Sequence, residues 1–105
     1  SNPIYRIDGK DVFIDIPLAP WEATLGTTVN VPTPAGSTLE LKIPAGTIAG
    51  RKMRLKGKGI PSAEPGDLYV VPTIALPPAE TETQKEAYQQ FEKAFDFNPR
   101  THLKG

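Results

Sequence analysis

The stretch LKIPAGTIAGRKMRLKGKGIPSAEPGDLYVV, residues 41–71, decides the fold of this chain. It contains five of the nine glycines, and its order indicates strand, turn, strand, glycine-bracketed loop and strand. Pro44 and Gly46 suit a tight turn, because proline presets φ at the second turn position and glycine tolerates positive φ. Residues 52–56 alternate polar and apolar side chains, as a half-buried strand does. The Gly-Lys-Gly sequence at residues 57–59 is compatible with an anion-binding loop and with a structural corner, and the corner is favoured.

The length and composition bound the fold class. A chain of 105 residues is the size of one domain and buries ~65% of its unfolded surface. The sequence has no cysteine, which excludes disulfides and thiolate metal sites within it. Without cysteines the redox compartment cannot be inferred, and a cytoplasmic location is the default expectation. No apolar run approaches the ~18 residues of a membrane span. Residues 1–3 resemble an expression-tag remnant and linker.

The charges are balanced overall but segregated along the chain. Twelve basic and twelve acidic residues give a net charge of zero. A neutral domain binds nucleic acid poorly, because affinity for the phosphate backbone comes mainly from positive charge. One run nevertheless holds five basic residues and no acidic one: Arg51, Lys52, Arg54, Lys56 and Lys58. This run is interpreted as a solvated strand face, with a nucleic-acid contact as the alternative.

Periodicity predicts the remaining elements of the β region. Alternating apolar residues predict strands over residues 11–18 and 68–76 and a hairpin over residues 27–33 and 37–43. Residues 19–26 predict a short helix that begins with a proline and ends at a glycine.

Three single residues in these elements carry expectations of their own. Phe13 falls on the polar face of its strand, where partial cover by a neighbour is favoured over a binding role. Trp21 is expected to pin the short helix to a sheet, with ligand stacking as the alternative. Pro72 cannot donate to a ladder, so its strand is expected at a sheet edge or a bulge.

The C-terminal region predicts one long helix over residues 83–95. Thr83 and Glu86 fit a capping box at its start. Apolar residues recur at helical spacing and continue beyond the helix: Ala87, Tyr88, Phe91, Ala94, Phe95, Phe97 and Leu103. This stripe packs either on the chain's own sheet or against another chain, and the spacing alone favours the first.

The sequence offers no catalytic arrangement. His102 is the sole histidine and lies near the C-terminus without an orienting partner. The spacing of Asp8, Asp11 and Asp15 matches no calcium loop. We therefore predict no enzyme activity, no catalytic residue, no metal site and no cofactor.

An ordered series of motifs gives a more specific indication. These are PLAPWEA at 17–23, VNVPT at 29–33, KIPAGT at 42–47, LKGKGIP at 55–61 and GDLYV at 66–70. Over residues 4–95 the chain resembles the second C-terminal β-domain of the DnaJ family, the J-domain co-chaperones. The first motif most resembles the bacterial curved-DNA-binding branch of that family.

The resemblance implies a mainly β, small sandwich-like domain of short strands over residues 4–78, with one short helix, and a C-terminal helix and dimerisation tail over residues 79–105. In the family, such domains hold unfolded polypeptide for a DnaK-type chaperone, and the extreme C-terminus forms a homodimer. That role changes the interpretation of the aromatic stripe to an intermolecular contact. The dimerisation residues expected by this analogy are Tyr88, Phe91, Phe95, Phe97 and Leu103.

The resemblance also implies a client site and sets its limits. An apolar client slot would be lined by Ile14, Ile16, Val29 and Val31, although each of these is singly more consistent with plain core. The sequence holds no His-Pro-Asp motif of a J-domain, no zinc-binding cysteine region and no first β-domain, so an auxiliary client role is expected. The alternatives are DNA binding through residues 51–58, which would accompany a nucleoid location, and a purely structural dimer arm.

Overall fold

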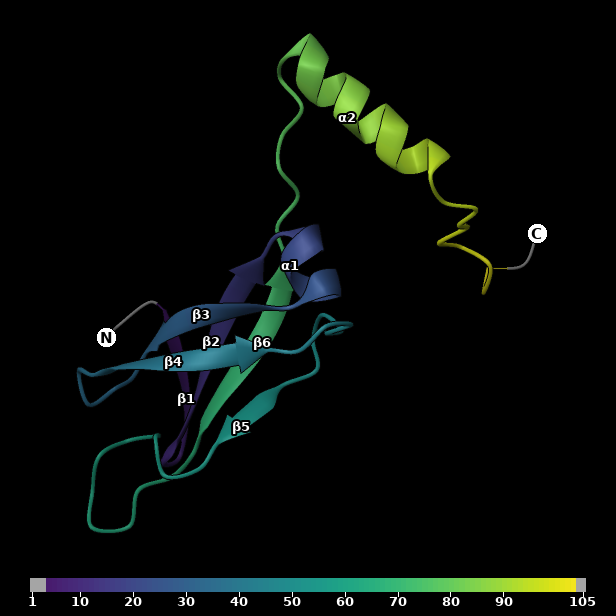
Figure 1. Cartoon of the computed structure of the whole chain (residues 1–105). Coiled ribbons are helices and arrows are strands. Elements are labelled where there is room, and N and C mark those ends of the chain that lie inside the picture. Colours follow the sequence, from purple (N-terminus) through teal and green to yellow (C-terminus); the bar gives the residue numbers. More distant parts are fainter. Residues whose placement is uncertain (1–3, 104–105) are drawn as a thin grey trace.

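The computed structural model describes residues 4–103 and has a mainly β architecture (Figure 1). The predicted fold class is confirmed, whereas the proposed tag remnant at residues 1–3 lies outside the described residues. In chain order the elements are β1 (Tyr5–Asp8), β2 (Asp11–Leu18), α1 (Pro20–Leu25), β3 (Thr27–Pro32), β4 (Thr38–Ile43), β5 (Met53–Leu55), β6 (Leu68–Ile74) and α2 (Glu82–Lys93).

Four strands form the main sheet in the order β1-β2-β6-β5. The two central strands, β2 and β6, are parallel, and each edge strand is antiparallel to its neighbour. Parallel neighbours need a long connection, and here it carries α1, the β3–β4 hairpin and β5. Residues 41–71 therefore contribute to both sheets, because they include the end of β4, all of β5 and the start of β6.

The predicted hairpin forms the second sheet. β3 and β4 pair antiparallel and cross one face of the four-stranded sheet (Figure 1). The core lies between the two sheets, and the inward residues of β2, β6 and β3 are buried there: Val12, Ile14, Leu68, Val70 and Val31. Leu18, Ala23 and Ile43 form a second buried cluster where α1 joins the sheets. Removal of this apolar surface from water is the main source of stability for such a small domain.

The predicted edge or bulge position of the strand that contains Pro72 is wrong. That strand, β6, is central and not at an edge, and Pro72 pairs in register with Ile16 of β2. The missing N–H is tolerated because β5 begins only at Met53, opposite Val70, so no residue of β5 pairs with Pro72. The Pro72 carbonyl instead accepts a hydrogen bond from the N–H of Gly50. The N and O of a strand residue point to the same side, so the proline nitrogen faces this gap and costs the β2–β6 ladder nothing.

The short helix α1 forms as predicted, but Trp21 does not pin it to a sheet. The Glu22 carboxylate accepts a hydrogen bond from the Ala19 N–H at 2.9 Å and closes the first turn. The residue that packs on the sheets is Ala23, whereas Trp21 is 57% exposed. The small alanine lets the helix backbone approach Leu18 closely, and the indole is left on the opposite side of the helix.

The C-terminal helix α2 begins two residues earlier than a Thr83 cap requires. The Thr81 hydroxyl accepts from the Gln84 N–H at 3.1 Å, and the Gln84 side chain accepts from the Thr81 N–H at 2.9 Å. Two overlapping Thr-x-x-Glu/Gln patterns occur here, and the earlier one forms the capping box. No residue of α2 is buried, and the helix lies away from both sheets (Figure 1). Within residues 4–103, neither helix is long and apolar enough to cross a bilayer.

Candidate functional site

The loop at residues 57–59 is a structural turn. The anion bound to its backbone is the carboxylate of Asp67, from the same chain. The Gly57 N–H donates to Asp67 Oδ1 at 2.9 Å, and the Arg54 Nε donates to Asp67 Oδ2 at 2.6 Å. The Gly57 N–H lowers the pKa of Asp67, partial burial opposes this shift, and the Arg54 hydrogen bond and charge lower it further. Because Asp67 already occupies these donors, the loop does not offer them to an external phosphate.

Next to this turn, two glycines allow the backbone segments at Gly59, Gly66 and Lys10 to approach one another closely. The Gly59 N–H donates to the Gly66 carbonyl at 2.9 Å, and the Ile60 N–H donates to the Lys10 carbonyl at 3.0 Å. A Cβ at Gly59 or at Gly66 would overlap the Lys10 carbonyl oxygen, which is backbone and has little freedom to move. The glycines of this motif therefore allow three backbone segments to meet, and their role is structural.

The predicted basic run is only partly available to a partner. All five of its basic side chains are exposed, but Arg54 is paired with Asp67. The Lys52 ammonium lies 5.4 Å from the Phe13 ring centroid and 5.1 Å from that of Tyr69. Among residues 4–103, no ion pair involves Arg51 or Lys58. The outward surface of this run therefore consists of lysines and one arginine beside a stacked aromatic pair.

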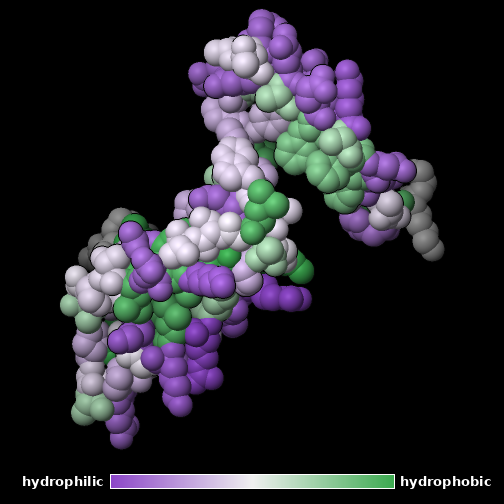
Figure 2. All heavy atoms as spheres, viewed as in Figure 1, coloured by the Kyte–Doolittle hydropathy of each residue, from purple (hydrophilic) through white to green (hydrophobic). Residues whose placement is uncertain are grey.

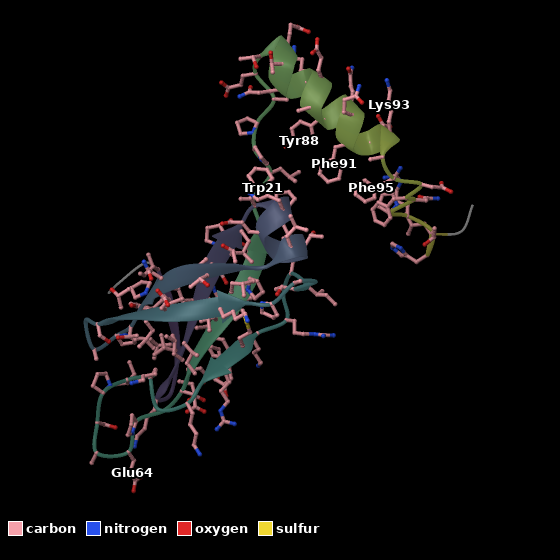
Figure 3. All side chains as sticks on the ribbon, in the orientation of Figure 1. Trp21, Glu64, Tyr88, Phe91, Lys93 and Phe95 are labelled. Carbon is pink, nitrogen blue, oxygen red and sulfur yellow. The ribbon has the colours of Figure 1, made fainter. Side chains whose placement is uncertain are left out.

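The predicted dimerisation residues all lie on exposed surface. Tyr88 and Phe91 project from the side of α2 that faces α1, Phe95 lies on the same side just beyond the end of the helix, and Lys93 projects from the opposite side (Figure 3). Phe91 and Phe95 contact each other, with ring centroids 5.2 Å apart. The exposed fraction of the side chains rises from 36% at Tyr88 to 76% at Phe97 and is 61% at Leu103. The described structure therefore does not pack the stripe on its own sheets.

A cleft of about 210 Å³ separates α2 from α1. The Tyr88 hydroxyl donates to the Pro77 carbonyl, which holds α2 against the segment that leads to it. Figure 2 shows hydrophobic side chains on the side of α2 that faces the β-domain. Aromatic and proline side chains account for most of the lining, which comprises Pro20, Trp21, Pro77, Pro78, Gln84, Ala87, Tyr88 and Phe91.

The predicted client slot is divided between core and surface. Ile14 and Val31 are buried between the two sheets, 3% and 0% exposed, because they face each other across the core. Ile16 and Val29 are half-buried at its margin. Only Ile16 and Val29 therefore retain side-chain surface for a client, and client binding at this position stays a prediction.

Sequence reasoning does not predict the contacts that three residues make in these surfaces. Asp67 enters it only as part of a motif, although an acid shortly after a basic run is a signal for an internal ion pair. Tyr69 stacks on Phe13, but the two are far apart in sequence and only the β2–β6 register brings them together. Trp21 lines the cleft beside α2. The spacing of residues within one helix does not show which other element lies next to it.

These structural elements match a known family. The DnaJ C terminal domain family matches residues 1–77. The chain therefore belongs to the DnaJ C-terminal domain family, which is a family of co-chaperones. The resemblance inferred from the motifs is confirmed.

Curated relatives narrow the comparison to one branch. The chain is 44% identical to a curved DNA-binding protein of Coxiella burnetii over 104 residues, 99% of this chain and 33% of that protein. It is 46% identical to the curved DNA-binding protein of Escherichia coli O1:K1 over 101 residues, 94% of this chain and 33% of that protein. The chain thus spans about a third of the length of these relatives.

Proposed function

We propose that this chain binds or positions unfolded polypeptide for a DnaK-type chaperone and forms a homodimer through residues 79–105. The β-domain at residues 4–78 would carry the client contact, and no catalytic step is assigned to it. One observation carries the proposal: α2 presents an aromatic face that stays largely exposed in the described chain, with only the cleft toward α1 beside it. A cytoplasmic location belongs to the same proposal.

The exposed stripe supports the dimer on energetic grounds. A 12-residue helix is marginal in water by itself, because most helical stability comes from packing of an amphipathic face. The aromatic side chains of the stripe, from two copies together, would contribute on the order of 1,000 Å² to an interface. That area is close to the lower limit for a specific protein–protein contact. A second copy presents the same face, as a two-fold interface requires.

Sedimentation equilibrium tests the dimer. The wild-type chain is expected to sediment at twice its 11.4 kDa monomer mass, and the Phe91→Ala/Phe95→Ala variant at the monomer mass. Leu76→Ala is the matched control, because Leu76 is exposed but lies before α2. A wild-type monomer at high concentration, or a dimer that the double variant leaves unchanged, would remove the dimer from the proposal.

A peptide titration tests the client contact separately. An apolar, unfolded peptide is expected to bind weakly at the margin of the core, with Ile16→Ser and Val29→Ser lowering its affinity. Both side chains are half-buried, so each variant is compared only after its unfolding midpoint is known. Absence of binding at millimolar peptide would leave the chain as a purely structural dimer arm.

DNA binding is a second candidate function, favoured by the basic run at residues 51–58. The relatives are named curved DNA-binding proteins, and Lys56 and Lys58 are exposed here. Affinity for duplex DNA is expected to fall steeply with salt, because phosphate contacts release counterions. Lys56→Glu should weaken binding, whereas Lys85→Glu on α2 should not. Salt-independent binding, or equal effects of the two variants, would contradict this candidate. A nucleoid location follows only if it holds.

A further inference from the structure

One row of side chains crosses the four-stranded sheet on the face opposite the hairpin. Arg6 of β1 is in register with Phe13 of β2, Phe13 with Tyr69 of β6, and Tyr69 with Arg54 of β5. Paired strand positions point to the same face, so these four side chains share one surface. The core residues of β2 and β6 alternate with them and face the hairpin.

The two aromatic residues lie on the two central strands and form a stacked pair. Their ring centroids are 4.9 Å apart and their planes differ by 17°. Both rings are half-buried, so part of each aromatic surface remains accessible to solvent. The Lys52 ammonium lies beside both rings. α1 packs through Ala23 on Leu18 and Ile43, on the hairpin side, and leaves this face open.

The charges on this face favour an anionic partner. Asp15 is neutralised by Arg6 at 2.7 Å, and Asp67 by Arg54 at 2.6 Å. Asp8 and Asp11 share this face at the β1–β2 turn, where the Asp11 carboxylate accepts a hydrogen bond from the Asp67 N–H. On the β5 side of the rings the unbalanced charges come from lysines, with Lys52 at the rings and Lys56 close enough to Asp67 to lower its pKa. The face therefore combines accessible aromatic surface with excess positive charge along one edge.

We propose that this face binds single-stranded nucleic acid, with bases stacked on the Phe13–Tyr69 pair and phosphates beside Lys52 and Lys56. The proposal deepens the second candidate function and rests on its basic run. Aromatic residues on adjacent sheet strands stack with unpaired bases because every base has a π face, and flanking cations follow the backbone. In a duplex the bases already stack on one another, so a duplex engages only the lysines. An acidic peptide likewise uses the lysines and not the rings.

Fluorescence anisotropy tests the proposal with the full chain. The probes are a labelled 15-nucleotide oligo(dT), the matching oligo(U) and a duplex of equal length, each at low salt. The single strands should bind more tightly than the duplex. Phe13→Leu/Tyr69→Leu should weaken single-strand binding by about tenfold or more, the scale of one or two lost base–aromatic stacks, and leave duplex binding unchanged. Thr73→Ala is the control, because Thr73 belongs to the same strand face as Tyr69 and carries no ring.

A second measurement uses the wild-type chain only, so that it does not depend on whether the leucine variants fold. Addition of oligo(dT) should shift the ring-proton NMR signals of Phe13 and Tyr69 and not those of Phe95, just beyond α2. Three results would overturn the inference: no ring shifts, equal binding of single strand and duplex, or displacement by polyglutamate at equal charge. If the duplex binds and the rings do not respond, the basic run remains a DNA contact and only the stacking surface is lost. If neither nucleic acid binds, both proposals fail.

Discussion

Substitution of Gly59 by alanine probes the corner that organises residues 41–71. The new Cβ would overlap backbone atoms of Lys10, Gly66 and Asp67, none of which can rotate away as a side chain would. Relief of this overlap separates the segments and breaks the hydrogen bonds from Gly59 to Gly66 and from Ile60 to Lys10, at 2.9 and 3.0 Å.

The expected cost is large for so small a change. Two lost backbone hydrogen bonds contribute about 1 kcal/mol each, and overpacking adds about 1–3 kcal/mol. We expect a total near ~4 kcal/mol, a large part of the ~5–15 kcal/mol that stabilises a typical domain. With a urea m-value of about 1–3 kcal/mol/M, the midpoint should fall by roughly 2 M.

Urea unfolding followed by far-UV circular dichroism measures this cost. Gly36→Ala is the matched control, because Gly36 has φ +92° but a methyl group added there would meet no atom within 4 Å. Its backbone strain alone should cost about 1–2 kcal/mol. Gly59 itself has no positive φ, so a loss no larger than that of Gly36→Ala would contradict close approach of the backbone as the reason for the glycine at residue 59.

Three further predictions test other parts of the structure. Asp67→Asn should be less stable than wild type at pH 7, and the difference should shrink on acidification. The depressed pKa of Asp67 means that its carboxylate stabilises the fold above the unfolded-state pKa and loses this effect as pH falls through the folded-state pKa; a pH-independent difference would contradict this. Thr81→Ala should reduce the helicity of α2 at a cost of about 1 kcal/mol, whereas Thr83→Ala should not. A larger loss of helicity in Thr83→Ala would show that Thr83, and not Thr81, caps the helix. Tyr88→Phe removes the hydrogen bond to the Pro77 carbonyl. It should raise iodide quenching of Trp21 fluorescence with no change in the unfolding midpoint. Unchanged quenching would show that this hydrogen bond does not control access to the cleft.

Local patterns in the sequence predict the local elements well. The strand at residues 11–18 coincides with β2, and the predicted hairpin differs from β3 and β4 by one residue at one end of each. Alternation and turn residues are sufficient here, because each signal and its structural consequence lie within a few residues.

Long-range pairing explains what the sequence does not reveal. The position of β6 between β2 and β5 places Pro72 on a central strand. This costs no hydrogen bond only because β5 begins at Met53 and does not extend alongside Pro72. The same register joins Phe13 to Tyr69. The expectation that Trp21 packs on the sheet rests on the usual burial of large apolar residues, but the small Ala23 fills that position. The spacing of apolar residues predicts the stripe on α2, but it does not predict which surface packs against that stripe.

The most direct test of the proposed dimer is isotope-filtered NMR on a mixture of labelled and unlabelled chains. Only contacts between two copies give cross-peaks in this experiment. We predict intermolecular cross-peaks from the ring protons of Phe91, Phe95 and Phe97, and loss of the remaining Phe97 cross-peaks in the Phe91→Ala/Phe95→Ala variant. Absence of any intermolecular cross-peak at millimolar concentration, or cross-peaks confined to the β-domain, would contradict dimerisation through the aromatic face of α2.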